Sequence, residues 1–197
     1  MKKQIWVVGM VAAVFLATTL QAQQITAAFG VGTVLAPSAS SASGNYSSQS
    51  LSGGAYPAIS GDFLFHKNFG VMGEIAWRAS QNYYQGNYPY RPLLWDFNGM
   101  YAPKLGSKAQ AELTAGIGAE SIRFYQPFYS CTYVSCTNYT SSNHFMGHFG
   151  AGIRYYFHGG LFIRPEAHLY LIRNNFEFSS GHATRVGASI GYTFGER

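Results

Sequence analysis

Eight segments of this chain alternate between apolar and polar or small residues with a period of two. The last of them, residues 184–194, shows the pattern most clearly. Its apolar residues, among them Val186 and Ile190, share one face. Its polar residues, among them Arg185 and Ser189, share the other. Successive side chains of an extended chain point to opposite faces, so the pattern predicts strands with one apolar and one polar face.

The spacing of the eight predicted strands indicates an up-and-down topology. They cover residues 25–35, 55–65, 69–79, 93–102, 109–123, 144–157, 161–173 and 184–194. Most are close to the 9–11 residues that a tilted strand needs to cross a bilayer. The predicted connections are alternately long (37–54, 80–92, 124–143, 174–183) and short (66–68, 103–108, 158–160). In transmembrane barrels the long loops are extracellular and the short turns periplasmic.

The N-terminus has the features of a secretory signal peptide. Lys2 and Lys3 precede a long uncharged apolar run that ends near a small-residue cleavage site. A retained membrane helix would need about 20 apolar residues, and glutamines interrupt the run too early. We therefore expect a signal peptide at residues 1–22 and a single mature domain at residues 23–197.

Composition indicates that much of the surface does not face water. Charged residues make up 11% of the chain, against about 25% in an ordinary soluble domain. Without Lys2 and Lys3 the net charge falls from +5 to +3, and the remaining cations are dispersed. No cluster of Lys and Arg could follow a phosphate backbone, so we expect no binding of nucleic acid.

The distribution of residues between the two faces distinguishes a membrane barrel from a soluble one. A soluble lipocalin-like barrel also has eight strands, but its interior is apolar. Here glycines share the polar face, where small residues make room inside a narrow barrel. We therefore predict an all-β, eight-stranded antiparallel up-and-down transmembrane β-barrel, closed because lipid excludes open sheet edges. Its predicted aromatic girdle is Trp77, Trp95, Tyr101, Phe157 and Phe194.

The predicted interior of the barrel is polar and filled by side chains. Its inward charges nearly balance and must pair, because an eight-stranded barrel is just wide enough for its own side chains. The predicted lumen network is Asp62, Glu74, Arg78, Asp96, Glu120, Arg154, Arg164, Glu166 and Arg185, with His168 on the same face. The alternative is a polar path for protons or small ions.

Three short motifs carry a resemblance to a known family. The sequences KNFGV at 67–71 and FIRPE at 162–166 resemble turn-strand signatures of the small OmpA-like or opacity-type outer-membrane barrels. The sequence YTF at 192–194 resembles the closing strand of that family, although three further residues follow it here. The resemblance implies a location in the bacterial outer membrane, contact with outer-membrane lipid, and folding by the barrel-assembly machinery.

The remaining reactive groups give little sign of metal binding. Cys131 and Cys136 lie in a polar stretch of an exported chain, which favours a disulfide over two free thiols. His144 and His148 would be about 13 Å apart on a strand, too far to share one ion. We expect no metal site and no cofactor.

Candidate catalytic groups lie in the last long loop. Some eight-stranded barrels deacylate or acylate lipid A, and Glu177, Ser179, Ser180 and His182 are available for such chemistry, but no spacing identifies an activated nucleophile. The loops are instead rich in aromatic side chains: Tyr83, Tyr84, Tyr88, Tyr90, Tyr125, Phe128, Tyr129, Tyr133 and Tyr139. These either bind an extracellular ligand or pack on one another or on lipid headgroups. The predicted function is non-enzymatic, in envelope integrity or surface interaction. The alternatives are a narrow conduit for small solutes or apolar compounds, or a lipid A-modifying hydrolase.

Overall fold

Strands account for nearly all of the described chain. The computed structural model describes residues 24–36, 50–84, 87–131, 133, 136–174, 178 and 181–195. The strands are β1 (Gln24–Leu35), β2 (Tyr56–His66), β3 (Phe69–Trp77), β4 (Asn82–Tyr84), β5 (Tyr88–Tyr101), β6 (Ala109–Cys131), β7 (Cys136–His158), β8 (Leu161–Ile172) and β9 (His182–Phe194). No helix within these ranges is both long and apolar enough to cross a membrane. The predicted signal peptide lies outside the described residues.

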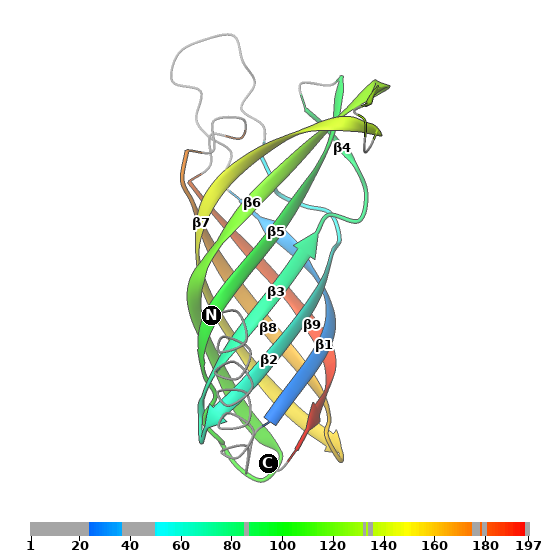
Figure 1. Ribbon diagram of the computed structural model, residues 1–197. Coiled ribbons are helices and arrows are strands. Elements are labelled where there is room, and N and C mark those ends of the chain that lie inside the picture. The colour runs from blue at the N-terminus through cyan, green and yellow to red at the C-terminus, as the bar shows by residue number, and fades with distance from the viewer. Residues whose placement is uncertain are drawn as a thin grey trace, which may run out of the picture.

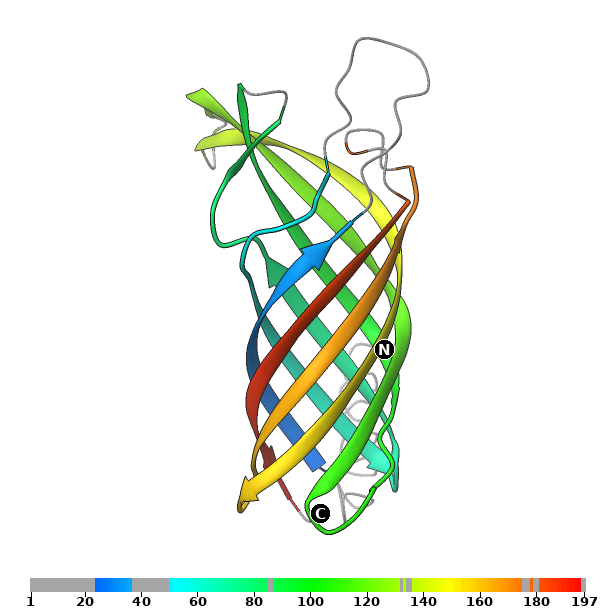
Figure 2. The same ribbon diagram turned by 180° about the vertical axis from the view of Figure 1, so that it is seen from behind.

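Eight of the nine strands close into a barrel. Every pairing is antiparallel, in the order β3-β2-β1-β9-β8-β7-β6-β5, and β3 pairs back onto β5. The first and last strands join in register from Ile25–Phe194 to Leu35–Thr184. Figure 1 and the reverse view in Figure 2 show the resulting barrel, whose strands are tilted relative to its axis. The predicted eight-stranded barrel is therefore confirmed, and the ninth strand, β4, pairs only with β5.

The two ends of the barrel differ in their connections. At one end, here called the turn end, β2–β3 and β7–β8 are joined by two-residue turns, in which Lys67 and Gly159 adopt positive φ. The first residue of β1 and the last of β9 lie at the same end (Figure 1). The opposite end, here called the loop end, holds the longer connections. This arrangement agrees with the alternation of long and short connections in the sequence.

Side chains of each barrel strand alternate between the wall and the interior. Phe29 and Phe97 point outward and are 54% and 70% exposed, whereas Asp62 and Asp96 point inward and are buried. Inward glycines allow adjacent strands to pack closely over these groups. A Cβ on Gly116 or Gly118 would lie 2.0 Å from a carbonyl oxygen of β5. The barrel thus has an apolar outer surface and a polar interior, the opposite of a soluble protein.

The prediction of a long loop at residues 124–143 is wrong. β6 continues to Cys131 and β7 begins at Cys136, so most of this segment is a hairpin. β5 pairs with β6 only as far as Phe124, and β8 pairs with β7 only from Met146 onward. Beyond these points the two strands pair with each other alone among the described residues. This part of the hairpin has no face against the barrel wall, and its residues are mostly polar. The alternation of apolar and polar residues that predicts a barrel strand is therefore missing there.

Two further predictions for the loop end can be compared with the structure. The disulfide between Cys131 and Cys136 is confirmed, and it joins directly opposite residues at the tip of the β6–β7 hairpin. The predicted loop at 80–92 is wrong in part, because it contains β4 and the first residues of β5. Prolines at 89 and 92 obscured that strand in the sequence. Most of the predicted connection at 37–54 lies outside the described residues.

Candidate functional site: a polar lumen

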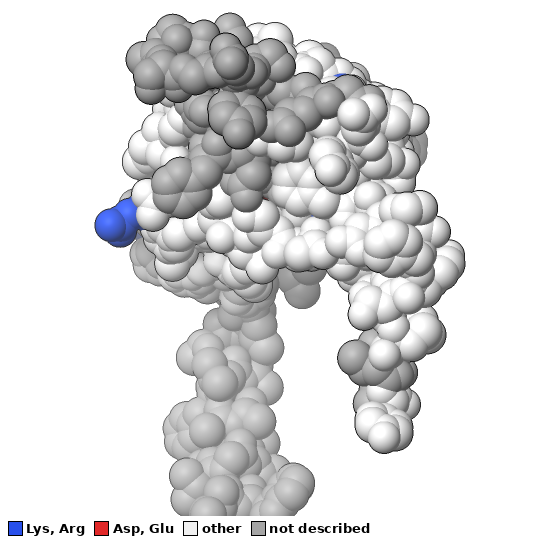
Figure 3. All heavy atoms as spheres, turned by 90° about the horizontal axis from the view of Figure 1, so that it is seen from above, with Lys and Arg blue, Asp and Glu red and all other residues white. Residues whose placement is uncertain are grey.

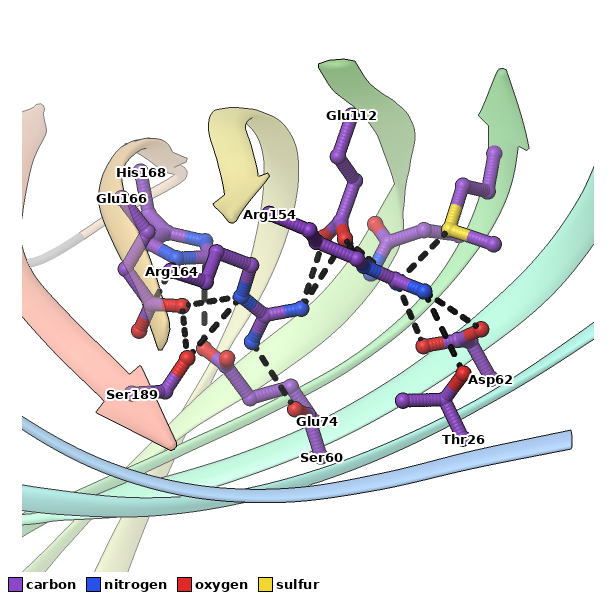
Figure 4. Close-up of polar contacts among 12 residues, drawn as sticks. Thr26, Ser60, Asp62, Glu74, Glu112, Arg154, Arg164, Glu166, His168 and Ser189 are labelled. Carbon is purple, nitrogen blue, oxygen red and sulfur yellow. Dashed lines mark hydrogen bonds and ion pairs between the residues drawn. The ribbon is translucent and has the colours of Figure 1, made fainter. Parts of the chain in front are cut away.

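Arg154 of β7 is the centre of the polar network nearest the turn end. It is fully buried, and its Nη2 lies 2.6 Å from Oδ2 of Asp62 on β2. Its Nε donates to Glu112 of β6 at 2.7 Å, and its Nη1 donates to Thr26 of β1 at 3.2 Å. One guanidinium therefore joins β7 to β6, β2 and β1 (Figure 4).

Arg164 of β8 occupies the next level of the interior. Its Nη1 donates to both carboxylate oxygens of Glu112, at 2.9 and 3.0 Å, so Glu112 bridges Arg154 and Arg164. Its Nε donates to Glu166 at 2.7 Å, and its Nη2 donates to the Ser60 hydroxyl at 3.0 Å. All three nitrogens of the Arg164 guanidinium thus have hydrogen-bond acceptors, as a buried guanidinium requires.

Arg185 of β9 continues the chain of ion pairs toward the loop end. It pairs with Glu74 of β3, and its Nη1 lies 3.3 Å from Glu166. Its Nε donates to the Tyr170 hydroxyl at 3.1 Å. Glu166 therefore bridges Arg164 and Arg185, just as Glu112 bridges Arg154 and Arg164. The result is a continuous series of alternating charges along the barrel axis.

Two histidines lie beside this series. His148 and His168 are buried with nearly parallel rings, and Nε2 of His148 lies 2.9 Å from Nδ1 of His168. The other ring nitrogen of His148 is 2.7 Å from Asn98 and 3.3 Å from Asp96. His148 is thus an internal hydrogen-bonding group.

One group of side chains has spacing suitable for a metal ion. Oxygen and nitrogen atoms of Glu74, Glu166 and His168 lie within 4.8 Å of one another. Both carboxylates already pair with Arg185. A metal ion bound there would have to displace a guanidinium from its two partners, so the present arrangement favours the ion-pair network.

Apolar clusters lie toward both ends of the interior. Toward the loop end, 13 buried residues form one cluster: Val34, Leu51, Tyr56, Ala58, Ala76, Tyr90, Leu94, Ile122, Met146, Tyr170, Ile172, Phe178 and Ala183. Toward the turn end, Leu64, Met72, Met100 and Ala102 form a second cluster, and Ala28, Tyr156 and Phe162 form a third. A cavity of about 140 Å³ opens at the turn end and is lined in part by Gln110 and Tyr156. The ion pairs of Arg154, Arg164 and Arg185 thus lie between apolar clusters.

The structure places all nine side chains predicted for the lumen network in the interior. Seven of them, Asp62, Glu74, Asp96, Arg154, Arg164, Glu166 and Arg185, contact one another directly or through Glu112 and the two histidines. Glu120 and Arg78 lie nearer the loop end. Two nitrogens of Arg78 have no hydrogen-bond partner among the described residues.

The sequence analysis missed Glu112 and His148 as members of the network. Both alternate with outward apolar neighbours, Leu113 and Phe149, so the period of two contained the signal. The six described carboxylates (Asp62, Glu74, Asp96, Glu112, Glu120 and Glu166) all face the interior. Four arginines accompany them there, so the interior holds more carboxylates than guanidinium groups.

The predicted girdle residues point outward at two levels. Trp77 and Trp95 lie toward the loop end, and Trp95 is 42% exposed. Tyr101, Phe157 and Phe194 lie toward the turn end and are exposed. Aromatic rings at both edges of an apolar wall are typical of the two membrane–water interfaces of a barrel.

The loop aromatics divide into two groups. Tyr90 is fully buried, and both Tyr90 and Tyr84 pack on Phe178 at the closed end of the lumen. Tyr83, Tyr88, Phe128, Tyr129 and Tyr133 are exposed. Among the candidate catalytic residues only His182 is described, and it is exposed.

An apolar wall, two aromatic levels and a closed sheet define a transmembrane β-barrel, and comparison with known families agrees. The chain matches the outer membrane protein beta-barrel domain family over residues 10–194 and belongs to that family. It is therefore an integral protein of the bacterial outer membrane and is surrounded by its lipid. The loop end is the extracellular end, as in other barrels of this class.

Solved structures with the same fold share little sequence with this chain. Neisserial surface protein A is 9% identical, with a TM-score of 0.59 over 87% of this chain and 97% of its own. Ail, the attachment invasion locus protein of Yersinia pestis, solved with the heparin analogue sucrose octasulfate, is 11% identical, with a TM-score of 0.56 over 89% and 100%. A major outer membrane protein of Thermus thermophilus is also 11% identical, with a TM-score of 0.56 over 88% and 100%. No curated protein sequence matches the chain.

Proposed function

We propose that this protein is a non-enzymatic surface protein whose barrel anchors an extracellular β6–β7 hairpin for interaction with other molecules. The observation that carries the proposal is the closed interior combined with this hairpin. Arg154, Arg164 and Arg185 are each held by two carboxylates between apolar layers. Such an interior provides a rigid anchor and little room for transport.

The hairpin supplies the surface. It extends beyond the barrel wall at the loop end (Figures 1 and 2). Near its tip Phe128 and Tyr129 are 68% and 70% exposed, and the Cys131–Cys136 disulfide holds its strands together. Aromatic side chains on a constrained ribbon offer large contact areas at a low cost in conformational entropy. We propose an extracellular ligand for this tip.

The alternative of a small-solute conduit is less well supported. A solute crossing the lumen would have to separate ion pairs in at least three successive layers and part the Tyr90–Phe178 contact. Breaking one such buried pair costs several kcal/mol, on the order of 3–5. The alternative of a lipid A hydrolase depends on Ser179 and Ser180, which lie outside the described residues. Mass analysis of lipid A from cells with and without the protein tests it directly.

Biogenesis follows from the sequence features. We propose that residues 1–22 direct export and are removed, and that the barrel-assembly machinery then inserts residues 23–197. No cofactor is part of the proposed function.

A shortened hairpin separates the proposed role from a role in envelope integrity. Tyr125 and Tyr139 are directly opposite, so replacing residues 126–138 with Asn-Gly closes the ribbon with a tight turn and leaves the barrel unchanged. Bacteria carrying the full-length protein, the shortened protein or neither are compared for two properties. These are retention on layers of cells or extracellular-matrix protein, and exclusion of a membrane-impermeant dye.

The proposal predicts that the shortened protein excludes dye as well as the full-length protein does but loses most of the retention. Equal retention by the two forms would contradict it. Dye entry that both forms prevent, without any effect on retention, would favour envelope integrity instead.

A further inference from the structure

Two arginines face each other on the outer wall of the barrel near the loop end. Arg91 of β5 and Arg123 of β6 are directly opposite in the antiparallel register. Both alternate with buried neighbours, Tyr90 and Ile122, and therefore point outward. Like charges directly opposite on one face of a sheet repel and destabilise it. A pair of this kind is stabilised when an anion lies between the two charges.

The described residues provide no such anion. Nη2 of Arg91 donates to the Ala79 carbonyl at 3.2 Å, and Nε of Arg91 is buried without a hydrogen-bond partner among the described residues. Arg123 lies over the ring of Tyr139 at 4.9 Å. All six described carboxylates are inside the barrel, and the loop end in Figure 3 shows basic but no acidic atoms among its described residues. The donors left for an external acceptor are thus Nη1 of Arg91 and the nitrogens of the Arg123 guanidinium.

The position of the pair matches the depth of lipid phosphates. Arg91 is four residues beyond the girdle residue Trp95 on the same outward face. Four residues of strand span about 13 Å, or about 9 Å along the membrane normal at a tilt near 45°. Trp95 lies at the membrane–water interface, so the arginines lie in the polar headgroup layer.

The neighbouring side chains suit a phosphate and an attached chain. Ser121, Ser141 and Asn143 share the outward face with Arg123 and add hydroxyl and amide donors. On the β3 side of β5, Trp77, Trp95 and Phe97 border an apolar groove of about 490 Å³, whose other lining residues include Gly61 and Gly73.

We propose that Arg91 and Arg123 bind a phosphate of a phosphorylated outer-leaflet lipid of the lipid A type, and that one of its acyl chains lies in the groove beside Trp95. Planar guanidinium groups bind phosphate through paired hydrogen bonds, and two of them on one face can hold a single phosphate from both sides. The proposal concerns the membrane wall and is independent of any ligand of the hairpin.

The test measures lipid binding by native mass spectrometry of the full mature protein in detergent. The probes are bisphosphorylated lipid A, the same lipid after removal of both phosphates, and inorganic phosphate. The variant is Arg91→Gln with Arg123→Gln, and the matched control is Lys104→Gln with Lys108→Gln at the exposed turn end. Heat-modifiable gel mobility verifies that each variant is folded.

The proposal predicts that the wild-type protein and the lysine control bind bisphosphorylated lipid A about tenfold more tightly than the arginine variant does. It also predicts weak binding of the dephosphorylated lipid to all three proteins. Equal affinity of the arginine variant and the control would overturn the proposal, as would equal binding of both lipids. Displacement of the lipid by inorganic phosphate at the same concentration would also overturn it, because the site would then recognise a free anion.

Discussion

Replacing Arg154 should destabilise the barrel more than replacing Arg164, although both are fully buried arginines that each contact two carboxylates. Among the described residues, Asp62 has no ion pair other than the one with Arg154. In Arg154→Met this carboxylate becomes an uncompensated buried charge, which costs about 3–5 kcal/mol of unfolding free energy. In Arg164→Met, Glu112 keeps Arg154 and Glu166 keeps Arg185. The expected loss there is about 1–3 kcal/mol, the usual cost of lost hydrogen bonds to charged groups.

A compensating substitution tests whether the uncompensated charge is the cause. The double change Arg154→Met with Asp62→Leu removes both members of the pair, and replacing a buried ion pair by apolar groups is often nearly neutral. We therefore expect the double variant to recover at least about 2 kcal/mol of the loss in the single variant. Lys108→Met, at an exposed position on the turn end, should cost about 0–1 kcal/mol.

The assay is equilibrium urea unfolding of the refolded protein in detergent, followed by heat-modifiable gel mobility. If the lumen were an open aqueous path, water would screen these charges. Arg154→Met and Arg164→Met would then both cost no more than Lys108→Met. Equal small losses for all three variants would refute the reasoning, and so would a double variant less stable than Arg154→Met alone.

Three further predictions address the wall, the hairpin and the N-terminus. Gly118→Ala should lower the unfolding free energy by about 1–3 kcal/mol, because its Cβ would lie 2.0 Å from a carbonyl oxygen. Gly106→Ala, where a Cβ would meet open space, should leave the unfolding free energy unchanged, and equal urea midpoints for the two variants would contradict this. Cys131→Ser with Cys136→Ser should leave membrane insertion unchanged, because a disulfide that closes so short a loop contributes less than the roughly 3 kcal/mol of a 15-residue loop. The double variant should still speed proteolysis of the hairpin, and loss of insertion would contradict the prediction. Sequencing of the mature N-terminus should begin at Gln23, and a protein that retains Lys2 would contradict the predicted signal peptide.

The barrel itself could be predicted from the sequence because the membrane imposes a strict alternation on it. Where a strand crosses the apolar layer, each outward residue must be apolar, and the period of two then predicts the strand and its inward face together. The strand predicted at 109–123 therefore contains Gln110 and Thr114 on one face and Leu113 on the other. Glu112 belongs to the same inward row. Consistent use of the period would have included it.

The extension of β6 and β7 could not be predicted in the same way. Residues 125–131 and 136–143 lie beyond the apolar layer of the membrane, and neither face of the ribbon must be apolar. Their Ser, Thr, Asn and Tyr residues therefore resemble those of a loop in composition. The pairing of Tyr125 with Tyr139 becomes evident only from the register of the folded strands.

Nor could the partners within the lumen be predicted. Arg154 and Asp62 are 92 residues apart in sequence, and Arg185 and Glu74 are 111 apart. Which inward side chains meet depends on the tilt and stagger of the closed sheet, and a shift of register by two residues would preserve every inward face while exchanging the partners. The set of inward charges is thus a property of the sequence, and their pairing is a property of the closed barrel.

Conductance across a planar lipid bilayer tests the central claim of a closed lumen most directly. The interior is crossed by ion pairs from Asp62 to Glu74 and has apolar clusters toward both ends. The account predicts that inserted, correctly folded protein gives no stable current steps above those of the bare bilayer. Reproducible steps whose ion selectivity changes in Glu74→Gln would contradict it, because they would show that ions pass through the charged layer of the barrel.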